Sequence, residues 1–599
     1  MYILGLNIFH GDSSACLFKD GNLIAAAEEE RFRRIKHWAG FPSEAINWCL
    51  SEAGINLENI DHIAINQNSK ANLGRKIIFT LSNRPSFKML ISNFQKKLKR
   101  LNIKDYLLKK FPGYKFKGSI HFVEHHTAHL SSAFHVSPFQ ESVVISVDGF
   151  GDFASTSWGV GKGIKINIKN SVYFPHSLGI FYQALTQFIG FYNYGDEYKV
   201  MGLAPYGKPL YIDKMREIVK LKSNGSFELN LKYFKHHNEK IDFKWENGSP
   251  YVGTLFSTEL EKLLGPARTK DKELTQHHKD IAHSVQAMYE EAFFHLLNNL
   301  HKKYKIDNLA IAGGCGMNSV ANGKVLLKTS FKKIYIQAAA GDAGGAIGAA
   351  LTTWHKSESK HSKKRISPHN HAYWGPSFTN DYISNLLKSQ KNKIEKENCI
   401  IENFSEISEL IKLIAAEIAK GKVVGWFQGK MEWGPRALGN RSIICDPRRS
   451  DMKDILNLKI KRRESFRPFA PSILREEVSD WFEQNDDVPF MMQVYQVIKN
   501  KRLEIPAVTH VDGSGRLQTV DEKTNPRYYQ LIHAFKNLTG VPMVLNTSFN
   551  ENEPVVCKPE EALETFLRTK MDILVLGNWM IKRKNIDKNE IIRNNNCIN

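Results

Sequence analysis

Two segments of the chain share one pattern of apolar and polar positions. In residues 2–30 an apolar run, YILGLNI, ends in a polar turn containing glycine and aspartate, and two further apolar runs follow. Residues 142–170 repeat this plan, with SVVISVD, the turn GFGD and two more runs. Each copy predicts three strands joined by tight turns. Two copies predict a duplicated α/β fold with a cleft between its halves, where ligands bind at strand ends.

Further along the chain the period of the apolar positions changes. Residues 278–300 have apolar side chains at helical spacing, and residues 308–312 form an apolar run typical of a buried strand. In the C-terminal part, residues 407–420 predict an amphipathic helix and residues 422–429 a buried strand. Near the end, residues 541–546 predict a strand that delivers polar side chains to a loop.

A polar, proline-broken stretch, HKSESKHSKKRISPHNH, separates the two groups of elements. Such a composition is typical of a boundary between domains. It predicts the following division: a first domain over 1–355, a linker over 356–371, a second domain over 372–585 and a polar tail over 586–599.

Composition fits a globular protein with at least two cores. The chain has 599 residues, of which 42% are hydrophobic. Its seven cysteines are odd in number and never spaced CxxC, so we expect reduced thiols in a cytoplasmic protein. No window approaches the ~18 apolar residues of a membrane helix, and the N-terminus lacks the pattern of a signal peptide.

The net charge of +21 is concentrated in one segment. Residues 70–117 contain fourteen lysines and arginines against one acid, Asp105, with aromatic residues interleaved. Such a segment can bind anionic lipid, nucleic acid or a phosphorylated substrate. We favour a solvated basic face on an amphipathic insertion, because lysine is abundant throughout the chain.

A metal site is predicted from two histidines and two aspartates. His125 and His129 lie four residues apart in HHTAHLSSAF, a predicted helix, so both imidazoles lie on one face. Asp148 follows a buried strand, and Asp342 lies among glycines at another strand end. Imidazole and carboxylate ligands suit iron, manganese or zinc. The alternative is an ordinary helix followed by a turn, because the spacing HxxxH is common by accident.

The densest polar sequence is KMEWGPRALGNRSIICDPRR, residues 430–449, followed by IKRRESFRPFAPSI, residues 460–473. Arginines beside glycine and proline turns are suited to recognising phosphate or carboxylate. Structural salt bridges are the alternative. We disfavour them because few acids are nearby in the sequence.

Nine blocks of this sequence, in order, resemble the NodU/CmcH-type O-carbamoyltransferases over nearly the whole chain. They are HGDSSACLF with EEERFRRIKH, HHTAH, VDGFGD, GDEYKVMGLAPYG, GGCGMN, GDAGGAIGAA, MEWGPRALGNRSI, KRRESFRPFAP and NTSFNENEP. The resemblance implies a duplicated ribonuclease-H-like (actin-type) N-terminal domain and a YrdC-like C-terminal domain. It also implies that ATP and carbamoyl phosphate form carbamoyl-adenylate in the second domain, and that a hydroxyl in the first domain accepts the carbamoyl group.

Residue roles follow from the same resemblance. The metal, iron by analogy, is assigned to His125, His129, Asp148 and Asp342. Nucleotide binding in the first domain is assigned to Gly313, Gly314 and Asn318. Mg²⁺ accompanies ATP, and the phosphates and the carbamoyl group are assigned to Arg436, Asn440, Arg441, Lys461, Arg463, Arg467, Asn546 and Ser548. His10 and Asp12 are candidates for the acceptor side, although a polar turn explains both equally well.

Two other functions remain open from the sequence. One is tRNA modification by threonylcarbamoyl transfer, which the blocks GPRALGNRSI and NTSFNENEP disfavour. The other is a nucleic-acid or membrane-surface protein that uses the basic segment. The acceptor, a small molecule or a saccharide, is not readable from the sequence. A homodimer is expected from the family, a nucleic-acid partner is not expected, and a membrane surface is not favoured.

Overall fold

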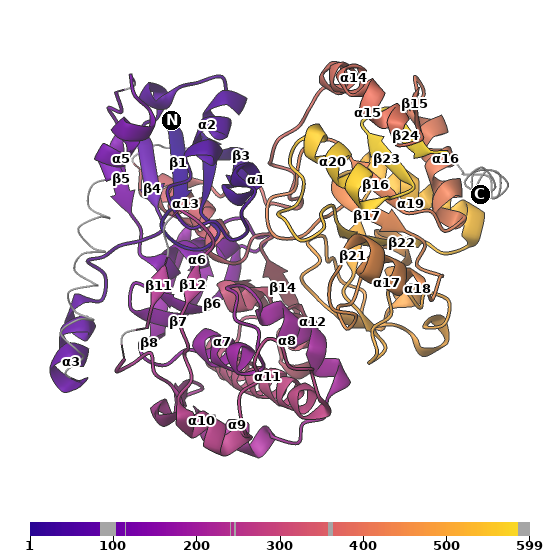
Figure 1. Cartoon of the computed structure of the whole chain (residues 1–599). Coiled ribbons are helices and arrows are strands. Elements are labelled where there is room, and N and C mark those ends of the chain that lie inside the picture. The colour runs from indigo at the N-terminus through magenta and orange to yellow at the C-terminus, as the bar shows by residue number, and fades with distance from the viewer. Residues whose placement is uncertain (84–102, 114, 240, 245–246, 358–362, 585–599) are drawn as a thin grey trace.

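A computed structural model of the chain describes residues 1–83, 103–113, 115–239, 241–244, 247–357 and 363–584. The N-terminal part, indigo to magenta, and the C-terminal part, orange to yellow, lie side by side as two bodies (Figure 1). The predicted tail over 586–599 and residues 358–362 of the predicted linker lie outside the described residues.

The first sheet has the strand order β3-β2-β1-β4-β5. β1 pairs antiparallel with β2 and parallel with β4. The outer pairs follow the same pattern: β3 is antiparallel to β2, and β5 is parallel to β4. Its strands are β1 (Tyr2–Asn7), β2 (Ser14–Lys19), β3 (Asn22–Glu28), β4 (His62–Ile65) and β5 (Ser119–Phe122).

A second sheet repeats this arrangement with the order β8-β7-β6-β13-β14. β6 pairs antiparallel with β7 and parallel with β13, as β1 does with β2 and β4. The repeated strand pattern that the sequence predicts is therefore present. The strands are β6 (Glu141–Gly151), β7 (Ala154–Lys162), β8 (Lys165–Tyr173), β13 (Asn308–Ala312) and β14 (Lys333–Ile336).

Two helices lie between these sheets. α6 (His125–Phe134) packs on β6 and β13, α13 (Gly345–Lys356) packs on β1 and β4, and the two helices pack on each other. They approach closely because Gly348 has no side chain: a Cβ there would lie 1.7 Å from the carbonyl oxygen of Ala128. This contact brings the N-terminal ends of both helices, which carry the predicted metal ligands, to one place.

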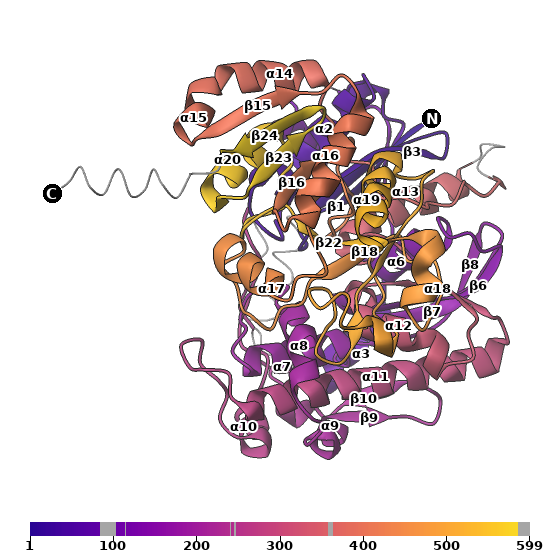
Figure 2. The same ribbon diagram turned by 90° about the vertical axis from the view of Figure 1, so that its right-hand side faces the viewer.

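The C-terminal body is built on one mixed sheet of eight strands, ordered β15-β24-β23-β16-β17-β22-β18-β21 (Figure 2). The predicted strands over 422–429 and 541–546 are β16 and β22, and both lie inside this sheet. The strands are β15 (Cys399–Asn403), β16 (Val424–Phe427), β17 (Arg441–Cys445), β18 (Ala470–Leu474), β21 (Gln518–Val520), β22 (Met543–Ser548), β23 (Ile573–Leu576) and β24 (Trp579–Arg583).

Helices cover the three sheets. The two that the sequence predicts from their period are α11 (Gln276–Tyr304) and α16 (Ile407–Ala419). The others of at least seven residues are α2 (Ser43–Glu52), α3 (Leu73–Asn83), α5 (Ile103–Lys110), α7 (Leu178–Phe188), α8 (Glu197–Leu203), α9 (Ile212–Ile218), α10 (Thr258–Leu264), α12 (Ser319–Lys328), α14 (Asn380–Ser389), α19 (Pro526–Thr539) and α20 (Pro559–Thr569).

The mixed α/β class that the sequence predicts is confirmed. The six cysteines in the described residues are free thiols, as expected. None of the described helices combines the length and the apolar content needed to cross a membrane.

Candidate functional site

Helix α6, strand β6 and the 3-10 turn before α13 bring the four predicted metal ligands together. The Nε2 atoms of His125 and His129 lie 3.0 Å apart, and each is 3.0–3.1 Å from Oδ2 of Asp148. Oδ1 of Asp342 lies 3.4 Å from Nε2 of His129 and 3.6 Å from that of His125. All four residues are buried or half-buried, and their ligand atoms lie within 4.8 Å of one another.

These separations fit one metal ion. Ligand atoms bonded to a single ion at ~2.1 Å stand ~3.0–3.4 Å apart in octahedral or tetrahedral geometry. Oδ1 of Asp342 is buried and accepts no hydrogen bond from the described residues, which leaves it free for a cation. Two neutral nitrogens and two carboxylates suit a divalent metal of the first transition row, and the geometry does not select among iron, manganese and zinc.

The backbone around Asp148 holds its carboxylate in place. Its Oδ1 accepts hydrogen bonds from the N–H groups of Gly149 and Gly314, at 2.8 and 3.2 Å. β6 continues past Asp148 to Gly151 with a shift of register after Val147, so this ligand lies within an irregular strand rather than at its end. Such irregularities re-aim a side chain.

His10 lies against this centre. Its Nδ1 is 3.7 Å from Oδ2 of Asp342, its ring stacks on that of His125 at 5.6 Å, and its Nε2 contacts the amide of Gln67. Asp342 is thereby approached from one side by the paired histidines of α6 and from another by His10.

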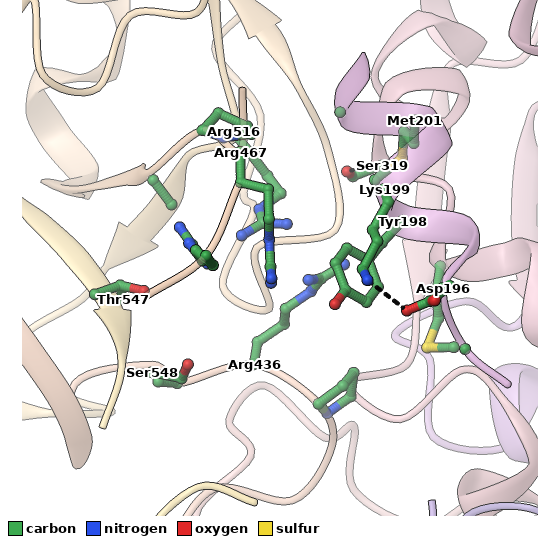
Figure 3. A pocket seen from close by; sticks show the side chains of 18 of the residues that line it. Asp196, Tyr198, Lys199, Met201, Ser319, Arg436, Arg467, Arg516, Thr547 and Ser548 are labelled. Carbon is green, nitrogen blue, oxygen red and sulfur yellow. Dashed lines mark hydrogen bonds and ion pairs between the residues drawn. The ribbon is translucent and has the colours of Figure 1, made fainter. Parts of the chain in front are cut away.

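A cavity of about 780 Å³ extends from Asp342 into the C-terminal body. The N-terminal body contributes residues of the loop before α8, including Tyr194, and the C-terminal body contributes the residues around β22. Figure 3 shows Arg436, Arg467 and Arg516 pointing into this cavity from the C-terminal body, opposite Tyr198 and Lys199.

Among the cationic side chains of the C-terminal body that line the cavity, we call five the cation cluster: Arg436, Lys461, Arg463, Arg467 and Arg516. Nε of Arg436, Nη2 of Arg463 and Nε of Arg516 are buried and have no hydrogen-bond partner among the described residues. The acid closest to the cluster, Glu464, lies 3.5 Å from Arg467 and is shared with Lys199. Buried donors without partners are rare in folded proteins, so the cluster fits a polyanion.

The pKa values of the cluster reflect the uncompensated charge. Burial lowers the pKa of Arg436 to about 10. Burial, and after it the charge of Arg467, lowers the pKa of Arg463 to about 9. Burial also holds the pKa of Lys461 well below its usual value, with further contributions from Arg463 and Arg467. A bound anion would relieve both the desolvation and the repulsion of these cations.

Lys461 connects the cluster to the loop after β22. Its Nζ donates hydrogen bonds to the carbonyl oxygen and the Oδ1 of Asn550, each at 2.8 Å, and to Oγ of Ser548 at 3.3 Å. Asn546 donates from Nδ2 to Ser472 and Gln518, whereas its buried Oδ1 has no hydrogen-bond partner among the described residues. Asn546 and Ser548 both line the cavity, as the prediction of a phosphate or carbamoyl site requires.

The cavity holds a second polar group, in which the predicted residue Asp12 is joined by Glu30 and His37, two residues that the sequence reasoning missed. Asp12, Glu30 and His37 each offer a ligand atom within 4.8 Å of the others. Oδ1 of Asp12 lies 2.8 Å from Nδ1 of His37, and the backbone N–H of His37 donates to Glu30 at 2.7 Å. Burial lowers the pKa of His37, but the charge of Asp12, its hydrogen bond to His37 and the charge of Glu30 together outweigh burial and raise the pKa to about 9. His37 and Glu30 belong to the block EEERFRRIKH. The resemblance of this block to the family was the sequence signal that could have identified both residues.

Arg441 and Asn440 lie outside the cavity and have structural contacts. The Arg441 guanidinium donates to the carbonyl oxygens of Gln428 and Pro376, at 2.6 and 2.8 Å, and lies over the Phe427 ring at 3.6 Å. Asn440 donates from Nδ2 to the carbonyl oxygen of Lys430. These contacts connect the chain segments on either side of Arg436. They hold the side chains of Arg441 and Asn440 outside the cavity.

Gly313, Gly314 and Asn318 also have structural contacts in this structure. Gly313 has φ +90°, and a Cβ there would lie 2.2 Å from the carbonyl oxygen of Val147. Asn318 caps α12 by accepting a hydrogen bond from the N–H of Ala321 at 3.1 Å. None of the three lines the cavity, although their neighbours Met317 and Ser319 do.

The expectation that too few acids are present to pair the arginines of residues 430–449 is wrong for two of them. Arg448 pairs with Asp446 at 2.7 Å, and Arg449 pairs with Asp451 at 2.5 Å. Both acids lie two residues from their partners, so these arginines form local ion pairs. Arg436 of the same segment has no such partner and points into the cavity.

Comparison with known proteins identifies the class of enzyme. The family description "Carbamoyltransferase N-terminus" matches residues 2–351, and "Carbamoyltransferase C-terminus" matches residues 415–583. The chain belongs to this carbamoyltransferase family, and the protein is a carbamoyltransferase.

Among its relatives, an uncharacterized protein of Synechocystis is 41% identical over 97% of both chains. The nodulation protein NolNO of Sinorhizobium fredii is 38% identical over 96% of this chain and 80% of its own length. The 3'-hydroxymethylcephem-O-carbamoyltransferase of Amycolatopsis lactamdurans is 33% identical over 41% of this chain and 42% of its own. The resemblance to NodU/CmcH-type carbamoyltransferases is therefore confirmed.

Proposed function

We propose that this protein is an ATP-dependent O-carbamoyltransferase that makes carbamoyl-adenylate at the cation cluster and uses it at the metal centre. One observation carries this proposal: a single cavity is lined both by the cation cluster of the C-terminal body and by the metal ligand Asp342 of the N-terminal body. An activated intermediate can therefore pass between the two centres without leaving the protein.

In the first step water cleaves carbamoyl phosphate, which leaves carbamate and phosphate. A carbamate oxygen then attacks the α-phosphorus of ATP, and pyrophosphate leaves as the bond to the adenylate forms. The reactants are polyanions and their mutual repulsion opposes the attack. Positioned arginines and a lysine lower that barrier by neutralising charge, with Mg²⁺ on ATP adding to the effect. Arg436, Lys461, Arg463, Arg467 and Arg516 are the residues we assign to this role.

In the second step the acceptor hydroxyl attacks the carbamoyl carbon, the bond to the adenylate oxygen breaks and AMP leaves. We assign Asp12, oriented by His37, to accept the hydroxyl proton. His10 is assigned to the same side because it contacts Asp342. His125, His129, Asp148 and Asp342 would hold a divalent metal, for which we propose iron, and that ion would supply charge stabilisation to the leaving phosphate.

The acceptor is proposed to be a hydroxyl of a small molecule or saccharide, because a relative is named for carbamoylating a hydroxymethyl group. We also propose that the two five-stranded sheets form the duplicated ribonuclease-H-like fold and that the C-terminal body is YrdC-like. The repeated strand order supports the first assignment. The proposed division of the chain remains at residues 356–371, and a homodimer remains a proposal from the resemblance.

Mass-spectrometric detection of carbamoyl-adenylate tests the function. The wild-type protein with ATP, Mg²⁺ and carbamoyl phosphate should form carbamoyl-adenylate and catalyse ATP–pyrophosphate exchange. His129→Ala should retain both reactions and fail to carbamoylate an acceptor, because it changes only the metal centre. An adenylate formed only from bicarbonate and threonine would support the tRNA-type function instead. Equal loss of both steps in His129→Ala would contradict the proposed division between the centres.

A further inference from the structure

Asn546 is a buried side chain on the wall of the cavity, and one end of its amide has no partner. The residue is 1% exposed and lies inside the C-terminal sheet, where it is paired with Ile444 of β17 and Ala470 of β18. Its Oδ1 is buried and has no hydrogen-bond partner among the described residues, although Asn546 lines the cavity. Buried acceptors without partners are uncommon, so this oxygen fits a ligand that donates a hydrogen bond.

The orientation of the Asn546 amide is determined by two backbone carbonyl oxygens, which can only accept hydrogen bonds. The first, of Leu438, accepts from Nε2 of Gln518 at 2.9 Å, which turns Oε1 of Gln518 toward Asn546. The second, of Ala437, accepts from Nδ2 of Asn546 at 3.1 Å. Exchanging the oxygen and the nitrogen of either amide would bring two acceptors into contact, so the network itself assigns both amides.

Gln518 maintains this arrangement without lining the cavity itself. Its Oε1 accepts from Nδ2 of Asn546 at 3.1 Å and from the hydroxyl of Ser472 at 2.6 Å. Nδ2 of Asn546 also lies 3.0 Å from Oγ of Ser472. The amide hydrogens of Asn546 are therefore occupied within the protein, and Oδ1 is the atom of this amide that is left for a ligand.

The rest of the wall determines which ligand group this oxygen can meet. The cation cluster offers only hydrogen-bond donors, which suit a phosphate. An ionised phosphate oxygen cannot use Oδ1 of Asn546, because both atoms are acceptors. The amino group of carbamoyl phosphate is a donor and lies on the carbon next to the phosphate. Ala437 and Leu438 directly follow Arg436 in the chain, so the loop that brings a cation to the cavity also orients the acceptor.

We propose that Oδ1 of Asn546, positioned by Gln518, accepts a hydrogen bond from the amino group of carbamoyl phosphate and thereby selects it over acyl phosphates without that group. This inference rests on the proposed function, because it takes carbamoyl phosphate as a substrate of the cation cluster. The cations bind either kind of phosphate, and the neutral acceptor distinguishes them. An analogue that lacks the amino group leaves a buried polar atom unpaired, and such sites reject it strongly.

Calorimetric titration with two matched ligands tests the proposal. Acetyl phosphate has the charge of carbamoyl phosphate and a methyl group in place of the amino group. Each is titrated into the full-length protein with Mg²⁺ and α,β-methylene-ATP, so that no adenylate forms. The wild type should bind carbamoyl phosphate at least about tenfold more tightly than acetyl phosphate.

Two variants connect this ratio of affinities to the amide network. Asn546→Leu should reduce the ratio to within about twofold and leave the affinity for acetyl phosphate nearly unchanged. Gln518→Met should also reduce the ratio, although Asn546 is still present. The matched control is Asn537→Leu, the same substitution at an exposed position of α19, which should keep the wild-type ratio.

Equal affinities of the wild type for the two acyl phosphates would overturn the proposal, whether or not the variants fold. A wild-type ratio in folded Asn546→Leu would overturn it as well. So would a loss of affinity for the ATP analogue alone, because Oδ1 would then accept from the adenine amino group. Failure of the proposed function is seen separately, as the absence of carbamoyl-adenylate with ATP, and a measured preference for the amino group would still support this inference.

Discussion

Arg436 and Arg463 face the cavity and have buried guanidinium nitrogens without a hydrogen-bond partner among the described residues. Arg436 and Arg449 belong to the same segment of the sequence, yet they meet different surroundings. Arg449 pairs with Asp451 at the surface, whereas Nε of Arg436 is buried without a hydrogen-bond partner among the described residues. The residue type alone does not define a phosphate site. A buried guanidinium that faces the cavity and lacks a compensating acid fits one.

This contrast provides a prediction for the first reaction step. Arg436→Met should lower ATP–pyrophosphate exchange by ~10²-fold or more, because one positioned charge on a phosphoryl-transfer site is lost. Arg449→Met removes the same charge from a surface pair and should leave the exchange within about twofold of the wild-type rate. The exchange rate with carbamoyl phosphate measures both. Equal effects of the two substitutions would show that only net charge matters.

The pair Asp12–His37 predicts a pH dependence of stability. The pKa of His37 is raised to about 9 in the folded protein, against ~6.5 when unfolded. The pair therefore stabilises the fold fully below pH ~6.5, and this contribution is lost as the pH rises through about 9. We expect ~2 kcal/mol at most, because the His37 side chain is 30% exposed.

Thermal unfolding of wild type and His37→Gln measures this contribution. The difference in Tm should be largest near pH 6 and should shrink toward pH 9 and above. A difference that is constant over this range would mean that His37 contributes through packing and not through its charge.

Among the elements, α6 and α13 determine where the predicted metal ligands meet. α6 carries both histidines, and α13 begins three residues after Asp342. Their close approach depends on Gly348, where a Cβ would lie 1.7 Å from the Ala128 carbonyl oxygen. The spacing of the two histidines was readable from the sequence, since it follows from the period of a helix. The contact between helices more than 200 residues apart was not.

Gly348→Ala should therefore destabilise the fold by ~2 kcal/mol or more, because the helices must separate to admit a methyl group. Gly74→Ala is the matched control: Gly74 is also helical, and a Cβ there meets nothing within 4 Å. It should be neutral or stabilising by up to ~1 kcal/mol, as expected for glycine replaced in an open helix. Denaturant unfolding compares the two variants. Similar effects would contradict the proposed role of the helix contact.

At the level of the whole molecule, buried contacts join the two bodies beside the cavity through which we propose that the intermediate passes. Nη2 of Arg31 donates to the carbonyl oxygen of Gly434 at 2.9 Å, and the N–H of Gly434 donates to Glu28 at 2.8 Å. Arg31 also pairs with Glu30 at 2.7 Å. These buried contacts hold the loop of Arg436 against the N-terminal body and close one wall of the cavity.

Arg31→Met should weaken this wall and release the intermediate to water. ATP–pyrophosphate exchange should persist, while the AMP formed per carbamoylated acceptor should rise several-fold. Arg216→Met, which removes an exposed pair with Glu291, is the control and should leave this ratio unchanged. The ratio is measured by quantifying AMP and carbamoylated product together. An unchanged ratio in Arg31→Met would indicate that the intermediate does not travel through the cavity.

The sequence by itself determined the local structure and the family of this protein. The periods of its apolar positions predict β1–β3 and β6–β8 of the repeated sheets and the helices α11 and α16, because backbone geometry imposes those periods on any buried face. The spacing of His125 and His129 predicts a paired ligand set for the same reason. The strands β4 and β5 were not predicted. The order of nine blocks predicts the carbamoyltransferase class, which the comparisons confirm.

Only the tertiary structure decided which polar residues share a site. Arg441 and Arg436 are equivalent in the sequence, but one is bonded to backbone carbonyls and the other points into the cavity. His37 joins Asp12 across 25 residues, and Asp342 joins α6 across more than 200. Which face of α3 meets water was likewise set by Arg75 and Phe79 packing on β8 and its neighbour. Such outcomes depend on contacts between distant segments, and no local pattern encodes them.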